Sequence, residues 1–136
     1  MINLLDTSIA VAVLRGTPPI VHDRLREAVA TGARLHVSSI VLYELWHGVA
    51  RSDRTQFNAS RVQTFLAGDL GVLPFDEDDA ATAGAIRAAL ERAGTPIGPY
   101  DLLIAAQALR RRITLVTANV SEFARVPGLS WEDWTR

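Results

Sequence analysis

Short apolar runs alternate with longer helical patterns along this sequence, and that alternation limits its possible folds more than any other feature. Four such runs predict strands at residues 2–5, 35–37, 72–75 and 113–116. In the remaining segments apolar side chains recur at helical spacing. The helices predicted in this way span residues 7–14, 21–30, 40–50, 56–67, 78–93 and 99–112. Strands that alternate with helices favour an α/β fold with a parallel sheet.

Residues that start or stop helices support this segmentation. Thr7 and Ser8 are candidate caps for the first helix, and Asp76 is a candidate cap for the helix over 78–93. Pro99 suits the first turn of the helix that follows the GTPIGPY stretch. The arginines at 110–112 are expected to form a solvated helix C-terminus that favours the helix dipole, with RNA contact as the alternative.

Size and composition predict one globular domain over residues 1–136. The chain is 49% hydrophobic and 21% charged, which excludes wholesale disorder. No apolar run approaches the roughly 20 residues of a membrane span. The N-terminus has no basic leading region and carries Asp6 within its apolar part, so we expect no secretory signal and a cytoplasmic location. Because the chain has no Cys, disulfides, thiolate metal sites and cysteine nucleophiles are excluded.

The net charge gives no general indication of nucleic-acid binding. Fourteen basic residues against fifteen acidic ones leave a charge of -1, so any contact with RNA must be local. All of the basic residues are Arg, whose planar fork suits bidentate contacts with phosphate. Codon bias is the alternative explanation for this absence of Lys.

Acidic and amide side chains stand where the strands of a parallel sheet end or where helices begin. They are Asp6 after the first strand, Glu44 in the helix after the second, Asp101 at a helix start, and Asn119 and Glu122 after the last strand. Ligands of such sheets bind beyond the carboxyl ends of the strands, so we expect these residues to converge. Clustered carboxylates need a counter-cation, and oxygen ligands favour Mg²⁺ or Mn²⁺. Such an ion can activate water against a phosphodiester, which predicts phosphodiester hydrolysis.

Glu44 lies on an otherwise apolar helix. It shares a face with Ile40, Tyr43 and His47, and we expect that face to point inward. A carboxylate in such surroundings needs a partner. A salt bridge to one Arg is the structural alternative to a catalytic role.

The other candidates also have structural explanations. Asp6 could serve as a helix N-cap, and Asp101 could stabilise the start of its helix through the dipole. Asn119 and Glu122 could belong to an ordinary turn. The three histidines have no metal-ligand spacing, so we expect them at the surface or in packing contacts. Trp131 and Trp134 are expected to anchor the last segment by packing.

Four stretches in this order and spacing closely resemble the PIN-domain ribonucleases that act as VapC toxins of bacterial type II toxin–antitoxin pairs. They are LLDTS, SIVLYELWHG, GTPIGPYDLLIAAQA and LVTANVSEFARVPGLSWEDW, and the last two contain segments that look like the plasmid and enterobacterial branch. The resemblance implies a PIN-like three-layer α/β sandwich with a central parallel sheet of four to five strands flanked by helices. It also implies a Mg²⁺- or Mn²⁺-dependent endoribonuclease, usually a homodimer, that a VapB antitoxin inhibits.

The resemblance also assigns roles residue by residue. Asp6, Glu44 and Asp101 match the three acidic residues around the family's metal, and Thr117 matches the hydroxyl that supports the first aspartate. Many relatives have Asp where this chain has Asn119, so the fourth acidic role is assigned to Glu122. Our hypothesis is that Asp6 and Asp101 bind the ion directly, while Glu44 and Glu122 hold its waters and help to deprotonate the attacking one.

The expected substrate is structured RNA, and the resemblance favours a tRNA anticodon loop, whose cleavage would inhibit translation. One alternative is a catalytically weak PIN-like module that binds an antitoxin or RNA. Another is a phosphatase with Asp6 as nucleophile, which lacks an Asp two residues later, where Ser8 stands, and any Lys for the phosphate. Apolar helix faces around 40–46 and 57–66 are candidate partner surfaces.

Overall fold

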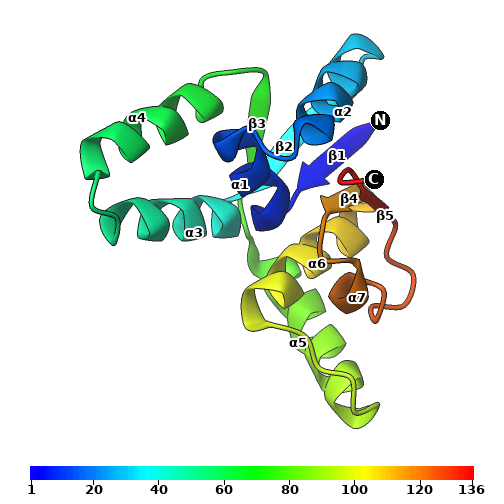
Figure 1. Cartoon of the computed structure of the whole chain (residues 1–136). Coiled ribbons are helices and arrows are strands. Elements are labelled where there is room, and N and C mark those ends of the chain that lie inside the picture. Colours follow the sequence, from blue (N-terminus) through cyan, green and yellow to red (C-terminus); the bar gives the residue numbers. More distant parts are fainter.

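The computed structural model describes residues 1–136 and contains a five-stranded, wholly parallel sheet flanked by helices (Figure 1). The strand order is β3-β2-β1-β4-β5. The strands are β1 (Ile2–Leu5), β2 (Arg34–Ser38), β3 (Leu70–Leu73), β4 (Thr114–Thr117) and β5 (Trp131–Asp133). The predicted fold class is therefore confirmed.

Seven helices connect and cover these strands. They are α1 (Thr7–Arg15), α2 (Pro19–Ala30), α3 (Ser39–Ala50), α4 (Thr55–Leu66), α5 (Glu77–Arg92), α6 (Pro99–Arg111) and α7 (Val120–Phe123). In Figure 1, α3 and α4 form a hairpin that extends to one side of the sheet, while α5 packs against α6 at another end. No helix is both long and apolar enough to cross a membrane.

The core lies around the central strand β1. Leu4 and Leu5 are fully buried, together with Val37 of β2 and Leu115 of β4. A strand that is covered on both faces by helices reads as a continuous apolar run rather than an alternating one, which is why the sequence pattern located β1 correctly. The same packing fixes the carboxyl end of β1, where Asp6 follows.

Two strand predictions need correction. The third strand spans Leu70–Leu73 rather than 72–75, because Pro74 has no N–H to donate to the ladder. The last strand, β5, was not predicted, since its WED sequence has no apolar run. Trp134 beyond it is buried, as expected of an anchor, but Trp131 within it is 38% exposed and does not act as one.

The prediction of a solvated C-terminus for α6 is wrong for Arg110 and Arg111, which form ion pairs, whereas Arg112 is exposed as predicted. Arg110 Nε and Arg111 Nη1 donate to Asp79 Oδ1 over 2.8 and 2.5 Å, and both guanidinium groups also pair with Asp76. Asp76 caps α5 as predicted, in a capping box with Asp79. These ion pairs hold α6 against the start of α5, so the RNA-contact alternative loses two of its three arginines.

Candidate active site

The site lies where the strand order reverses, beyond the carboxyl ends of β1 and β4. Asp6 directly follows β1, and Thr117 is the last residue of β4. These two strands pair in parallel with Leu5 opposite Val116, so the residues that follow them emerge side by side. A crevice at such a reversal is the usual ligand position in open α/β sheets. The predicted location of the site is consistent with this geometry.

Asp6 is almost fully buried and accepts three hydrogen bonds. Its Oδ1 accepts from the Ser8 hydroxyl at 2.6 Å and from the backbone N–H of Ile9 at 2.9 Å, and its Oδ2 accepts from the Thr117 hydroxyl at 2.5 Å. Burial raises the pKa of Asp6 above its ordinary value, these bonds oppose the rise, and the charge of Glu44 adds to it. Asp6, rather than Thr7 or Ser8, caps α1. The cap uses only Oδ1, so it does not account for the hydrogen bond that Oδ2 accepts from Thr117.

Glu44 reaches the same region from α3. Its Oε1 accepts a hydrogen bond of 2.6 Å from the Thr7 hydroxyl at the start of α1, and no Arg forms an ion pair with it. The salt-bridge alternative for Glu44 is therefore wrong. The helix face that it shares does not point inward either, because Tyr43 is 52% exposed and His47 is exposed as well.

Asp101 and Glu122 form a second carboxylate pair, joined by Asn119. The Asn119 amide donates to Asp101 Oδ2 at 3.2 Å and to Glu122 Oε2 at 2.7 Å. Glu122 Oε1 also accepts from the backbone N–H of Gly98 at 3.3 Å. Asn119 therefore holds the two carboxylates side by side without adding a negative charge of its own.

The electrostatics of this pair connect all four carboxylates. Burial, the hydrogen bond with Glu122 and the negative charges of Glu122, Asp6 and Glu44 together raise the pKa of Asp101 to about 7. The hydrogen bond from Asp101 lowers the pKa of Glu122, as do the donors Asn119 and Gly98. The pair thus shares one proton near neutral pH, with Asp101 as its carrier.

Backbone and hydroxyl groups tie the two pairs together. The N–H of Asn119 donates to the Thr117 hydroxyl at 2.8 Å, and the N–H of Ala118 donates to the Ser8 hydroxyl at 3.1 Å. The fold thus joins Asp6, Thr117, Asn119, Asp101 and Glu122 in one hydrogen-bond network, and Glu44 acts on Asp6 and Asp101 through its charge. No group of three or more acidic or histidine side chains is already arranged to hold a metal ion.

Sequence reasoning missed Thr7, Ser8 and Gly98 as supporting groups. Both hydroxyls were taken as helix caps, whereas their hydrogen bonds go to Glu44 and Asp6. The available signal was two hydroxyl residues directly after a strand-ending Asp. The contribution of Gly98 is a backbone N–H, which side-chain identity does not reveal.

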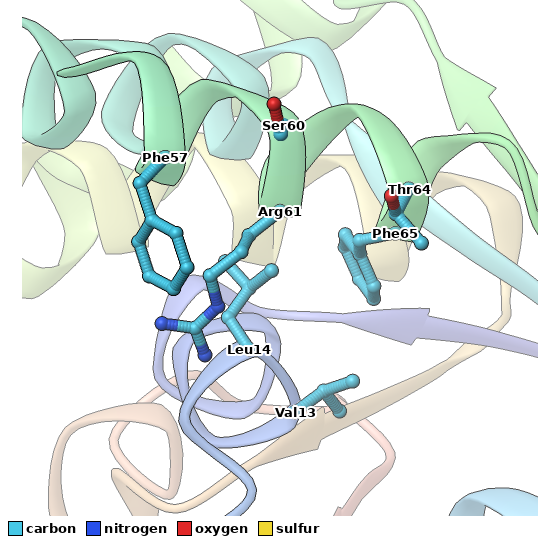
Figure 2. Close-up of a pocket in the computed structure, with 7 residues that line it drawn as sticks. All are labelled: Val13, Leu14, Phe57, Ser60, Arg61, Thr64 and Phe65. Carbon is cyan, nitrogen blue, oxygen red and sulfur yellow. The ribbon is translucent and has the colours of Figure 1, made fainter. Parts of the chain in front are cut away.

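An apolar pocket between α1 and α4 lies outside this network. In Figure 2, Phe57, Arg61 and Phe65 point from α4 toward Val13 and Leu14 of α1, and none of the six site residues lines it. A neighbouring pocket shares Leu14 and Arg61 and is also lined by Glu44. The two pockets therefore adjoin, and the second one reaches Glu44.

Comparisons with known proteins agree with this geometry. Residues 4–129 match the PIN domain family. The chain is 38% identical to the tRNA(fMet)-specific endonuclease VapC of Salmonella typhimurium, over 96% of each chain, and 38% identical to ribonuclease VapC2 of Rickettsia felis, over the whole of both.

Solved structures give the same result. The structure of VapBC2 from Rickettsia felis, bound to a DNA fragment from their promoter, superposes with a TM-score of 0.91 at 36% identity and covers 98% of this chain and 99% of that one. DNA-bound VapBC from Salmonella typhimurium superposes with a TM-score of 0.90 at 37% identity, over 98% of both chains.

Proposed function

Because this chain belongs to the PIN-domain family of VapC ribonucleases, we propose that it is a Mg²⁺-dependent endoribonuclease and the toxin of a VapBC toxin–antitoxin pair. One observation carries the proposal. Four carboxylates, Asp6, Glu44, Asp101 and Glu122, lie close together with no Arg in an ion pair to any of them, and burial together with the other three carboxylates raises the pKa of Asp101 to about 7. A divalent cation relieves that repulsion.

The donor set suits Mg²⁺, with Mn²⁺ as a substitute, because it consists of oxygen atoms with no Cys or His among them. We assign direct binding to Asp6 and Asp101, and binding through water to Glu44 and Glu122. When bound, the ion would supply positive charge that makes water more acidic and stabilises the charge that builds on the phosphodiester.

The chain's own residues prepare the carboxylates for this task. Thr117 and Ser8 fix both oxygens of Asp6 from two sides, and Thr7 fixes Glu44. Glu122 keeps its charge at neutral pH because its pKa is lowered, so it can orient water and accept a hydrogen bond from it. Asn119 positions Asp101 and Glu122, since its amide nitrogen donates a hydrogen bond to both.

The proposed substrate is a tRNA anticodon loop, whose cleavage inhibits translation. The Salmonella typhimurium and Shigella flexneri relatives are named for tRNA(fMet) specificity. A loop also offers a reachable backbone and unstacked bases, which an A-form duplex does not.

The proposed partners are a VapB-type antitoxin and a second copy of the chain. The similar solved structures are VapBC complexes. The apolar pocket at Phe57 and Phe65, which continues toward Glu44, is the surface that we assign to the antitoxin (Figure 2). An antitoxin segment that occupied both pockets would reach Glu44 and would block RNA from the carboxylates.

Cleavage of total bacterial RNA tests this proposal. The antitoxin-free chain is incubated with RNA in Mg²⁺, in Mn²⁺ and in EDTA, beside Asp6→Asn and Asp101→Asn, and new RNA ends are mapped. Asp53→Asn is the matched control, because Asp53 is exposed and lies in the turn between α3 and α4. Discrete cuts that need metal and are absent only from the first two variants support the proposal. If the RNA stays equally intact in every sample, the chain is a binding module without nuclease activity.

A further inference from the structure

Three aromatic rings form an exposed surface beside the carboxylate cluster. Tyr43 and His47 lie one turn apart on α3, with ring centroids 6.2 Å apart and ring planes only 6° from parallel. The ring of Tyr100, from α6, lies 5.5 Å from that of Tyr43 and is tilted by 55°. We call these three residues the aromatic surface. It bridges two helices that are far apart in the sequence.

Each tyrosine directly precedes a carboxylate of the proposed site. Tyr43 comes before Glu44, and Tyr100 comes before Asp101. The contact between the Tyr43 and Tyr100 hydroxyls joins the two helices that carry these carboxylates, α3 and α6. The aromatic surface therefore borders the place where the RNA backbone would lie.

The packing of the fold does not account for this exposure. Tyr43 is 52% exposed and Tyr100 is 42% exposed, and their one mutual hydrogen bond, of 3.4 Å between the hydroxyls, is itself at the surface. Phe123 and Trp134, which belong to the core, are buried, whereas Tyr43 and Tyr100 are not among the residues that pack against it. Rings left open to solvent next to a reactive centre are available to a ligand.

We infer that the aromatic surface of Tyr43, His47 and Tyr100 is a binding subsite for an unpaired RNA base next to the cleaved phosphodiester. The inference deepens the proposed function and rests on it. Every base has a π-face, so stacking on an aromatic ring holds single-stranded RNA with little dependence on sequence. Bases of an A-form duplex are stacked on one another and cannot reach such a surface, so the subsite selects loops over duplexes.

A base fits this surface better than a protein segment does. The rings carry hydroxyl and imidazole groups at their edges and stand beside carboxylates that an ion must neutralise. A nucleotide brings its phosphate to that ion and its base to the rings in one arrangement. The apolar pocket at Phe57, by contrast, is a concave surface lined by aliphatic and aromatic side chains, as a protein partner requires.

Binding of a fluorescent single-stranded RNA tests the inference. A short unstructured oligoribonucleotide with 2-aminopurine is titrated, in Mg²⁺, into full-length chains that carry Asp6→Asn to prevent cleavage. Tyr43→Ala and Tyr100→Ala are added singly to this background, with Tyr43→Phe and Tyr100→Phe as conservative variants. Trp131→Ala is the control, because Trp131 is 38% exposed and lies on β5, outside both the aromatic surface and the pockets assigned to the antitoxin.

We expect stacking to quench 2-aminopurine, and each Ala variant to lose about fivefold to 150-fold in affinity, as stacking energies imply. The Phe variants and Trp131→Ala should bind within about twofold of the background, because the stacking rings remain. An otherwise identical oligonucleotide with abasic positions should bind weakly and should not distinguish Tyr from Ala. Thermal unfolding midpoints of all variants should match, since the rings are exposed.

Several results would overturn the inference. Unchanged affinity in the Ala variants would do so, as would equal losses in the Ala and Phe variants, which would assign the effect to the hydroxyls. Normal RNA binding with reduced self-association in sedimentation velocity would instead assign the surface to a second copy of the chain.

The two proposals fail in different ways. If the chain without the Asp6→Asn change cleaves RNA at discrete sites and Tyr43→Ala leaves its KM unchanged, the subsite is refuted and the nuclease stands. If no metal restores cleavage yet 2-aminopurine is quenched only when the rings are present, the nuclease is refuted and the base-binding surface stands.

Discussion

Replacing Asp101 by Asn should stabilise the metal-free protein at alkaline pH. Burial and three neighbouring carboxylates raise the pKa of this side chain from 3.8 to about 7. A carboxyl with a raised folded-state pKa binds its proton more tightly when folded, so folding stability falls as pH rises from about 4 to 7. Above that range the ionised carboxylate destabilises the fold.

The size of the effect follows from that shift after a discount. A rise from 3.8 to about 7 sets an upper limit of about 4 kcal/mol. The Asp101 side chain is only half-buried, so solvent screens part of this energy. Because Asp101 and Glu122 share a proton, the lowered pKa of Glu122 stabilises the fold and offsets another part of the destabilisation. We expect Asp101→Asn to raise the free energy of unfolding by about 1–2 kcal/mol at pH 8, or roughly 3–8 °C in Tm.

Thermal unfolding in EDTA at pH 8 and at pH 5 measures this difference, with Asp53→Asn as the exposed control. The new amide can accept the bond from Asn119 and donate to Glu122, as the protonated carboxyl does. The gain should therefore disappear at pH 5, where Asp101 already carries a proton.

A loss of stability in Asp101→Asn at pH 8 would refute this reasoning. The carboxylate would then stabilise the start of α6 through the helix dipole by more than its neighbours repel it. Such a result would leave Asp101 with a structural role and would weaken the case for a cation site.

Three further outcomes are expected. Thr117→Val should lower the free energy of unfolding by about 2 kcal/mol, because a buried hydrogen bond to the charged Asp6 is lost. It should also move the acid limb of the cleavage pH profile to higher pH, since the pKa of Asp6 rises when that bond is lost. Thr117→Ser, which keeps the hydroxyl, should behave like the wild type in urea unfolding and in the pH profile. Asp79→Asn should cost about 2–4 kcal/mol in urea unfolding by freeing Arg110 and Arg111, whereas the exposed Asp78→Asn should cost almost nothing. Chelation should stop RNA cleavage and added Mg²⁺ should restore it, without a change in far-ultraviolet circular dichroism.

The Asp79 prediction has a defined pH dependence. Burial alone would raise the pKa of Asp79, but the N–H of Asp76 and the two arginines lower it below the ordinary value. Its contribution to stability is therefore complete above about pH 4 and is lost as the pH falls through the folded-state pKa. The urea midpoints of wild type and Asp79→Asn should converge in acid; a constant gap would contradict the ion-pair explanation.

Local patterns were enough to predict the fold class and the positions of the acidic residues. The buried run at 2–5 identified β1, and Asp6 had to follow it at the sheet edge. Asp76 before a helix identified a true cap. These features depend on residues within one or two turns of each other, which is the range over which sequence periodicity is informative.

Features that depend on distant partners could not be predicted in this way. Arg110 and Arg111 resemble a solvated helix end until Asp79, more than thirty residues earlier, is seen beneath them. Thr7 resembles a helix cap until α3 brings Glu44 to it. Pairing of β5 with β4 depends on the main chain rather than on an apolar pattern, so its sequence carries no strand signal.

Asn119 shows how a departure from the family's acidic pattern changes the balance between folding and metal binding. Without a cation, its amide donates to both Asp101 and Glu122 and so offsets part of the repulsion between these two carboxylates. An Asp at this position would instead add to that repulsion. With a cation, the same position offers a neutral amide that binds the ion less strongly than Asp would. Under the proposed function, the chain therefore gains stability in its metal-free state at the expense of affinity for the metal, and the four carboxylates would supply the negative charge that holds the ion.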